Sequence, residues 1–186
     1  MAEAKQAAQF EENLHAMRHS MAHILATAVQ ELYPGVTFGV GPVIENGFYY
    51  DFDLNDALTP EDLPKIEATM KEVIKAGERF EHQDMAIDEA IAYFKKRRQP
   101  YKVELLHDLK VHGTTVAKDI NRDQLGIKNE EKITTVSLYT NGNFTDLCRG
   151  GHLETTKQAG AFKLTKISGA YWRGKSENPQ MQRVYG

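Results

Sequence analysis

The strongest hydrophobic pattern in the chain is helical and lies between residues 14 and 32. Apolar side chains recur there at intervals of three and four, as on one face of an amphipathic helix. A Pro-Gly pair at residues 34–35 predicts where the helix ends. At about 100° per residue, His19 and His23 share a face roughly opposite the centre of the apolar stripe. We therefore expect them to lie off the main packing face.

After this helix the apolar side chains recur at every second position, which predicts a hairpin. Residues 36–44 are rich in Gly and β-branched side chains, and Asn46-Gly47 is a strong two-residue turn signal. Residues 48–54 would return as a strand. One face of that strand would hold its large apolar side chains, namely Phe48, Tyr50, Phe52 and Leu54.

Two further helices are expected. The first begins at a Thr59 cap followed by Pro60, and Gly77 ends it. The second covers residues 88–98, because Pro100 disfavours a helical conformation in the residue before it.

The remaining sequence predicts short strands and one irregular stretch. A second hairpin turn is expected at Asn141-Gly142. Residues 107–131 lack clear periodicity and are predicted to be irregular, and residues 168–186 are a polar, Gly-rich end. The other expected strands are residues 79–85, 101–106, 133–139, 144–147 and 162–167.

These elements predict an α+β fold with mostly antiparallel sheet, hairpins and several helices. Residues 1–13 would be a polar N-terminal extension, and residues 14–168 the main domain. Within that domain, residues 58–100 could be a small inserted α/β subdomain. Residues 169–186 would be a linker.

Composition narrows the functional classes. A hydrophobic share of 41% with 26% charged residues is typical of a globular protein, and the net charge of -3 argues against a surface that binds nucleic acid all over. A local basic patch stays open. One cysteine cannot form an internal disulfide, so we expect a reducing compartment, the cytoplasm. No apolar run approaches the roughly 20 residues that span a bilayer, so no membrane partner is expected.

Two short motifs hold the candidate chemistry. His19 and His23 are four residues apart, so both imidazoles lie on one side of the predicted helix. Cys148 and His152 have the same spacing directly after a predicted strand. Either pair alone is more typical of surface or structural residues, and a lone cysteine is usually a small hydrophobe. Together, three imidazoles and a thiol can converge on one zinc ion or one reacting carbonyl, which indicates hydrolytic chemistry.

Three more polar residues are candidates with an ordinary alternative. Lys102 is a solvated strand residue unless it faces the cavity of the histidines. Asp146 either orients a site residue or belongs to a turn. A buried Tyr50 hydroxyl needs a partner, which could be a substrate.

Two segments each have two interpretations. Residues 95–98 (Lys-Lys-Arg-Arg) are either a solvated helix end, stabilised by the helix dipole, or a patch for a phosphate backbone. Trp172, with Tyr171 and Arg173, is either a contact for RNA or another domain, or it packs the last segment.

Five motifs follow one another along the chain. They are His-Ser-x-Ala-His from residue 19, the segment 41–53, Tyr-Lys-Val at 101–103, residues 146–152, and Gly-Ala-Tyr-Trp-Arg-Gly at 169–174. In this order they resemble the amino-terminal editing domain of bacterial threonyl-tRNA synthetases, a fold that alanyl-tRNA synthetases share. The resemblance extends from about residue 14 to residue 186, and Phe-Tyr-Tyr-Asp and Ala-Tyr-Trp-Arg-Gly favour the threonyl branch.

The chain departs from the family pattern in two ways. Family members often have Pro at the position of Gly151, so the loop is expected to be looser here. The small ubiquitin-like domain that commonly precedes the editing domain is not present, and residues 182–186 are similar to the approach to an aminoacylation domain. We therefore expect a fragment of a longer synthetase, with residues 14–168 as editing domain and residues 169–186 leading to the absent aminoacylation domain.

The resemblance implies hydrolysis of mischarged seryl-tRNA(Thr). Serine lacks one methyl group of threonine, and a pocket gains only ~1–3 kcal/mol from such a group, so a threonine enzyme sometimes loads serine. A second site too tight for the methyl would hydrolyse the ester of seryl-tRNA and spare threonyl-tRNA. The implied partners are the tRNA(Thr) acceptor end carrying serine and the rest of the synthetase.

The resemblance also implies residue roles. His19 and His23 would orient or deprotonate the water and contact the terminal ribose, while Lys102 would stabilise the carbonyl oxygen or the leaving hydroxyl. The serine amine and side chain would lie against Cys148, Asp146 and His152. The remaining residues expected at the substrate are Tyr50, Gly41 and Arg149.

No cofactor is expected to be required. Zinc is possible, because alanyl-type relatives place it on the residues equivalent to His19, His23, Cys148 and His152, whereas threonyl-type domains resemble metal-independent enzymes. ATP and magnesium would serve only the absent aminoacylation domain. Three alternatives stay open: a zinc-dependent alanyl-type deacylase, a non-catalytic zinc-stapled RNA-binding module, and a hydrolase with Cys148 as nucleophile.

Overall fold

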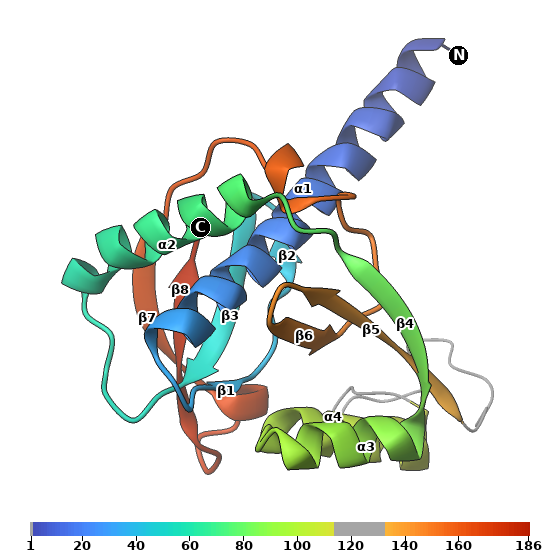
Figure 1. Cartoon of the computed structure of the whole chain (residues 1–186), viewed down its shortest axis with the longest axis vertical. Helices are drawn as coiled ribbons and strands as arrows, with labels where there is room; N and C mark the ends of the chain where they lie inside the picture. The colour runs from blue at the N-terminus through green and yellow to red at the C-terminus, as the bar shows by residue number, and fades with distance from the viewer. Residues whose placement is uncertain (1, 114–132) are drawn as a thin grey trace.

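A computed structural model describes residues 2–113 and 133–186, and in that part helices and antiparallel strands form the predicted α+β fold (Figure 1). The α-helices are α1 (Ala2–Leu32), α2 (Leu63–Ala76), α3 (Ile87–Lys96) and α4 (Pro100–His112). The strands are β1 (Thr37–Phe38), β2 (Val43–Ile44), β3 (Gly47–Asp53), β4 (Glu81–Ala86), β5 (Thr135–Asn141), β6 (Phe144–Leu147), β7 (Lys166–Tyr171) and β8 (Gln180–Tyr185). Short 3-10 turns lie at Pro60–Asp62 (η1), Thr156–Gln158 (η3) and Trp172–Gly174 (η4).

Helix α1 is the central element of the fold. It begins at Ala2, so most of the predicted polar extension is helical. Residues 20–29 are all buried, because α2, β3 and the β5–β6 hairpin pack on different sides of the helix (Figure 1). His23 is 1% exposed. The expectation that its face lies off the packing surface is therefore wrong for His23, which packs towards the hairpin.

The larger sheet supports α1. Its antiparallel strands lie in the order β1-β3-β8-β7, and β2 also pairs with β3. In β3, Phe48, Tyr50 and Phe52 are at most 3% exposed, so the predicted apolar face is confirmed. These rings pack with the buried side of α1 and with Ile66 and Met70 of α2 in one core.

The smaller sheet has the order β4-β5-β6 and its own core. Buried side chains from α3, α4 and β5 make this core, including Phe94, Leu106 and Leu138. The expected subdomain at residues 58–100 is therefore divided in the structure, because α2 packs on α1 whereas β4 and α3 join the smaller sheet.

The predicted strand at residues 101–106 is wrong, because these residues belong to α4. Pro100 is the first helical residue, where its missing N–H costs nothing, and does not act as a barrier. Tyr101, Leu105 and Leu109 are buried at intervals of four. The helix ends at Gly113, whose φ is 67°.

The C-terminal prediction also needs correction. The strand predicted at residues 162–167 begins only at Lys166 and continues to Tyr171. Gln180–Tyr185, expected within a polar linker, forms β8 between β3 and β7, with Val184 opposite Tyr50. The last segment therefore completes the larger sheet.

Both predicted turns are displaced by one residue. Ile44 pairs with Gly47, so residues 45–46 make the first turn, and Asn141 pairs with Phe144, so residues 142–143 make the second. Residues 107–112 are helical, and residues 114–131 of the predicted irregular stretch lie outside the described residues. Among the described helices, none has the length and apolar character to span a membrane.

Candidate active site

Two consecutive turns of α1 present the histidines of the first motif. His19 is half-buried and His23 is buried, since the helix lies deeper in the fold towards its centre. One turn further on, the Thr27 hydroxyl donates to the His23 carbonyl at 2.9 Å, and Asn141 Nδ2 donates to Thr27 Oγ1 at 2.8 Å. This contact fastens the end of β5 to the helix beside His23.

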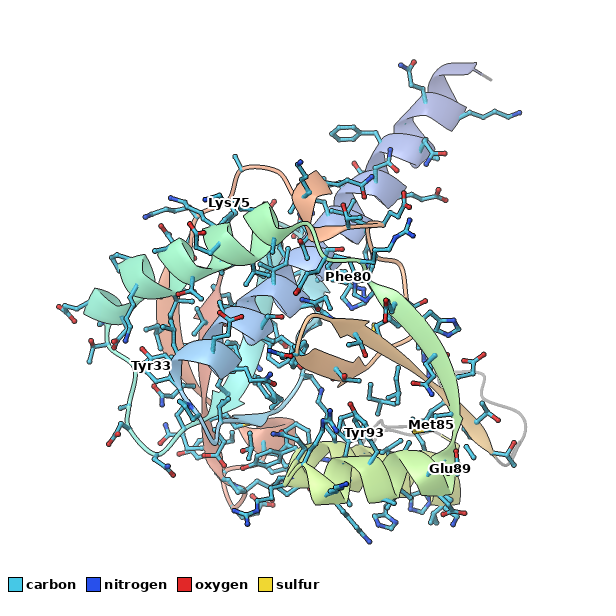
Figure 2. All side chains as sticks on the ribbon, in the orientation of Figure 1. Tyr33, Lys75, Phe80, Met85, Glu89 and Tyr93 are labelled. Carbon is cyan, nitrogen blue, oxygen red and sulfur yellow. The ribbon has the colours of Figure 1, made fainter. Side chains whose placement is uncertain are left out.

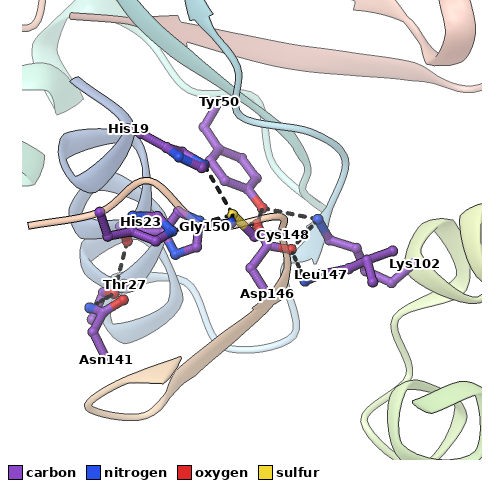
Figure 3. Close-up of polar contacts among 11 residues, drawn as sticks. His19, His23, Thr27, Tyr50, Lys102, Asn141, Asp146, Leu147, Cys148 and Gly150 are labelled. Carbon is purple, nitrogen blue, oxygen red and sulfur yellow. Dashed lines mark hydrogen bonds and ion pairs between the residues drawn. The ribbon is translucent and has the colours of Figure 1, made fainter. Parts of the chain in front are cut away.

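The second motif comes to the same place from the loop after β6 (Figure 3). Cys148 Sγ lies 3.2 Å from His19 Nε2 and 3.3 Å from His152 Nε2. The Gly150 N–H donates to the sulfur at 3.3 Å. The structure thus brings together the two motifs that lie more than a hundred residues apart in the sequence.

The imidazole rings form one cluster. The rings of His19 and His152 are stacked with centroids 4.1 Å apart, and the ring of His23 lies 4.3 Å from that of His152. Phe80 also stacks on His152, with an interplanar angle of 4°, and the centroid of the Tyr139 ring lies 4.8 Å from that of His152. These rings hold His152 in a defined orientation.

A buried ionic group adjoins the cluster. Asp146 and Lys102 form an ion pair, and both are at most 4% exposed. Asp146 also accepts from the Tyr50 hydroxyl at 2.5 Å and from the Leu147 N–H at 2.7 Å. Lys102 Nζ donates to Tyr50 at 3.2 Å. His23 Nε2 is 3.8 Å from Asp146 Oδ2, so this group and the histidines form one continuous site.

The last two predicted residues have different positions. Gly41 packs against the Tyr50 ring, where a Cβ atom would lie 2.1 Å from a ring carbon, so a larger residue would displace Tyr50. Arg149 is exposed beside Cys148, at the outer side of the loop. Gly151, at the position where Pro is expected, has φ +80°, which a proline ring cannot adopt.

Burial keeps the site uncharged around the sulfur. It raises the pKa of the Cys148 thiol to about 11 and lowers the pKa of His152 to about 2, with help from the neighbouring His23 and His19. Burial also lowers the pKa of His19, against the opposing charge of Asp146, and lowers that of His23 far more. At neutral pH, three neutral imidazoles therefore surround a protonated thiol.

Comparison with known proteins agrees with the motifs. The family described as "Threonyl and Alanyl tRNA synthetase second additional domain" matches residues 136–185, which contain the Cys148 loop and strands β7 and β8. A threonine–tRNA ligase of Dehalococcoides mccartyi is 46% identical over 174 residues, which cover 94% of this chain. The chain belongs to this second additional domain family.

Other relatives of the second additional domain give the same picture. Threonine–tRNA ligases of Gluconacetobacter diazotrophicus and a Sulfurihydrogenibium species are 45% and 43% identical, over 93% and 94% of this chain. The chain spans only about a quarter of their length, 24% and 25%, and 26% of the Dehalococcoides ligase. The likeness therefore concerns one part of a larger ligase.

The donor atoms of this second additional domain fit a zinc ion. The nitrogens and sulfur of the four residues His19, His23, Cys148 and His152 all lie within 4.8 Å of one another. Zinc bond lengths require separations of about 3.3–3.6 Å. Zinc-bound imidazoles usually donate a hydrogen bond from the ring nitrogen that does not bind the metal. The Nδ1 atoms of His23 and His152 are buried without a hydrogen-bond partner among the described residues, so this usual support for a bound zinc is missing. Zinc held by all four residues would tie α1 to the loop and leave no ligand position for water.

Sequence reasoning missed the residues that support the site. Ser20 accepts a hydrogen bond from the Leu153 N–H at 2.9 Å, which holds the end of the loop on α1. Its place inside the His-Ser-x-Ala-His motif was the available signal. Phe80, Thr27 and Asn141 gave no comparable signal, because their roles depend on contacts between distant segments.

Trp172 is a packing residue of the second additional domain. It is 4% exposed, its ring lies 4.9 Å from that of Tyr101, and its indole N–H donates to Glu104 at 3.0 Å. The alternative of an RNA contact by this side chain is therefore wrong. Arg173 adds ion pairs to Glu104 and Asp108, so the segment fastens the helix that contains Lys102.

Proposed function

We propose that this chain is the editing domain of a threonine–tRNA ligase and hydrolyses the ester of mischarged seryl-tRNA(Thr). The observation that carries the proposal is the convergence of His19, His23 and His152 beside the buried pair of Lys102 and Asp146. Neutral imidazoles can accept a proton from water, and a buried ammonium can stabilise an oxygen that gains negative charge. Both contributions lower the barrier to ester hydrolysis.

In the proposed reaction, the water oxygen bonds to the ester carbonyl carbon and the bond to the ribose oxygen breaks. The ribose oxygen takes a proton, and serine leaves as its carboxylate. His19 and His152 are both half-buried and both contact the sulfur. Because the family resemblance assigns the water to the pair on the helix, His19 would hold or deprotonate it, with His23 beneath it.

Lys102 suits the stabilisation of negative charge. Its ammonium is held by Asp146 and Tyr50, so it requires little reorganisation when the carbonyl oxygen or the leaving ribose oxygen becomes negative. Low exposure strengthens the interaction, because water does not screen it.

Selectivity against threonine would come from the fixed walls of the site. Asp146 would meet the serine amine and Cys148 and His152 the side chain, in a space too small for the extra methyl. Removing one methyl is worth only ~1–3 kcal/mol in a binding pocket, so a second, tighter site is what a threonine enzyme needs. Gly41 would keep the Tyr50 ring in place as part of that wall.

A cysteine nucleophile is less well supported. The thiolate is the reactive form, and the raised pKa of Cys148 keeps its thiol protonated at neutral pH. In the proposed reaction Cys148 shapes the site. Cys148→Ala should therefore retain measurable hydrolysis.

The test is deacylation of seryl-tRNA(Thr) and threonyl-tRNA(Thr) by this chain at high enzyme concentration. Faster loss of serine than of threonine, unchanged by a chelator, is the expected result. Equal rates for both esters, or no hydrolysis of either, would contradict the proposal.

A zinc-dependent deacylase is the second candidate, because the four donor atoms are close enough for one ion. It predicts that the chelator abolishes serine loss and that added zinc restores it. Stoichiometric zinc with no hydrolysis would instead indicate a zinc-stapled RNA-binding module.

A further inference from the structure

A cleft lined by both polar and apolar side chains lies apart from the histidine cluster, between the halves of the molecule that contain the two sheets. Its volume is about 490 Å³. One wall comes from the end of α1 and from β1, and the other from the end of α3 and from β6. The lining has two arginines, three amide side chains and two threonines, and no carboxylate. In a chain of net charge -3, this is a locally positive surface.

The two arginines are Arg97 and Arg98, from the basic run at residues 95–98. Both are exposed, and no described residue forms an ion pair with any of the four side chains in this run. Lys95 and Lys96 lie in the last turn of α3, where the helix dipole accounts for them. Arg97 and Arg98 follow the helix, so the dipole does not account for their side chains lining a cleft.

The backbone and side chains around the arginines are fixed in position. Arg98 has φ 55°, a left-handed conformation that ends α3, because the Arg98 N–H then donates to the Lys95 carbonyl and the Gln99 N–H to the Phe94 carbonyl, each at 3.0 Å. The Arg97 guanidinium lies over the Tyr93 ring, 4.1 Å from its centroid. Gln99 next to them bonds to β1 through both the Phe38 N–H and the Val36 carbonyl.

The cleft and the histidine cluster share strand β6. Thr145 lines the cleft, while the next residue, Asp146, lies in the candidate site. Neighbouring residues of a strand point to opposite faces. At about 3.3 Å per residue, the cleft at Asn143 lies roughly 16 Å along the chain from Cys148. A molecule that reaches from one to the other must therefore be larger than an amino-acid ester.

We propose that this cleft binds the phosphate backbone of RNA, through Arg97 and Arg98 with help from the amide and hydroxyl groups. Arginine, glutamine, asparagine and threonine are side chains that commonly contact phosphate and sugar without reading the sequence. The assignment to the acceptor arm of a tRNA rests on the proposed function. Double-stranded RNA is bound mainly by such backbone contacts.

The test measures binding of a labelled, uncharged acceptor-arm RNA hairpin by fluorescence anisotropy, from about 50 to about 200 mM salt. R97Q/R98Q should weaken binding about tenfold at low salt and reduce the slope of log K against log salt by about two. The matched control is K71Q/K75Q on α2, which changes the net charge equally. Figure 2 shows Lys75 far from Tyr93, the ring under Arg97.

A second variant guards against a folding artefact. R98G removes one positive charge and also relieves the strained backbone, so it should fold at least as well as the parent and still lose RNA affinity. The proposal is overturned if R97Q/R98Q keeps the parental slope, or if K71Q/K75Q loses as much affinity. It is also overturned if polyaspartate of equal charge displaces the labelled hairpin as well as unlabelled RNA does. The positive side chains would then bind any polyanion.

The outcome is separable from that for hydrolysis. Hydrolysis of seryl-tRNA by the parent chain tests the histidine cluster and uses no variant of the cleft. Arginine-dependent RNA binding without any serine loss would contradict the proposed function and retain the cleft. Serine loss together with RNA binding that does not depend on Arg97 and Arg98 would retain the proposed function and contradict the proposal for the cleft.

Discussion

The Tyr50 hydroxyl donates a 2.5 Å hydrogen bond to Asp146 Oδ2, although β3 and β6, which hold these residues, belong to different sheets. Burial, together with the Asp146 charge, raises the pKa of Tyr50 well above its usual value, so the hydroxyl keeps its proton and stays a donor. Lys102 from α4 pairs with both residues. Three elements therefore meet through one carboxylate.

Tyr50→Phe should remove this link while leaving the ring in the core. The carboxylate would lose a donor, and a hydrogen bond to a charged group contributes ~1.5–3 kcal/mol. We expect a loss of unfolding free energy in that range and slower serine release in single-turnover assays. Tyr49→Phe is the matched control, because its half-buried hydroxyl lies on the other face of β3. Equal behaviour of the two variants would contradict the role given to the Tyr50 hydroxyl.

The Lys102–Asp146 pair makes a stronger prediction. Breaking a buried pair leaves one uncompensated charge and costs about 3–5 kcal/mol, whereas replacing both partners is far less damaging. Lys102→Met and Asp146→Asn should each destabilise the fold strongly, and the double variant should recover part of the loss. Urea unfolding of all four proteins gives the coupling energy. Additive losses of unfolding free energy in that cycle would show that the two side chains do not act as a pair. All three variants should also be inactive in serine release.

The strands of the smaller sheet, strand β3 and the two chemical motifs could be predicted from the sequence, because they depend on local periodicity and on i, i+4 spacing. The helix around Lys102 could not, since Pro100 is compatible with either a helix end or a helix start, and only packing of Tyr101 on Trp172 decides it. Strand β8 was missed because its two buried side chains, Met181 and Val184, are three residues apart and so do not show the period of two that is typical of a strand. The convergence of Lys102 with Asp146 depends on tertiary structure alone.

The Arg173 segment predicts a remote effect on Lys102. Arg173 pairs with Glu104 and Asp108, which are two and six residues after Lys102 in α4. Arg173→Ala should slow serine release several-fold when assayed well below the melting temperature of the variant, because α4 would lose a fixed position. Lys110→Ala removes the pair with Asp88 at the far end of α4 and serves as control. Exposed pairs contribute only ~0–1 kcal/mol, so this control should stay close to the parent.

The pH dependence follows from the histidine pKa values. A base works in its neutral form, and burial lowers the pKa of His19, His23 and His152 below the usual 6.5. Between about pH 7.5 and about 5.5, a base with the ordinary histidine pKa would lose roughly tenfold in rate, and the rate here should fall by less than that. Single-turnover rates, corrected for spontaneous ester hydrolysis, test this. An inflection near the ordinary histidine pKa would contradict it.

The same shifts predict that stability falls in acid. The unfolded chain binds protons at these histidines as the pH drops below about 6.5, while the folded chain does not until lower pH. Unfolding free energy should therefore decrease from that pH downwards. His19→Gln, which cannot titrate, should show a shallower decrease, measured by urea unfolding at several pH values.

The loop glycine at position 151 allows a test of the backbone itself. At φ +80°, an alanine would meet no atom within 4 Å, so Gly151→Ala should cost only the backbone strain, about 1 kcal/mol. Gly151→Pro should cost more, because the proline ring fixes φ near −65° and the loop must change shape between Cys148 and His152. We expect unfolding free energies in the order parent, alanine, proline, with slower serine release for the proline variant. A proline variant as stable and active as the parent would mean that the positive φ is not needed to bring Cys148 and His152 together.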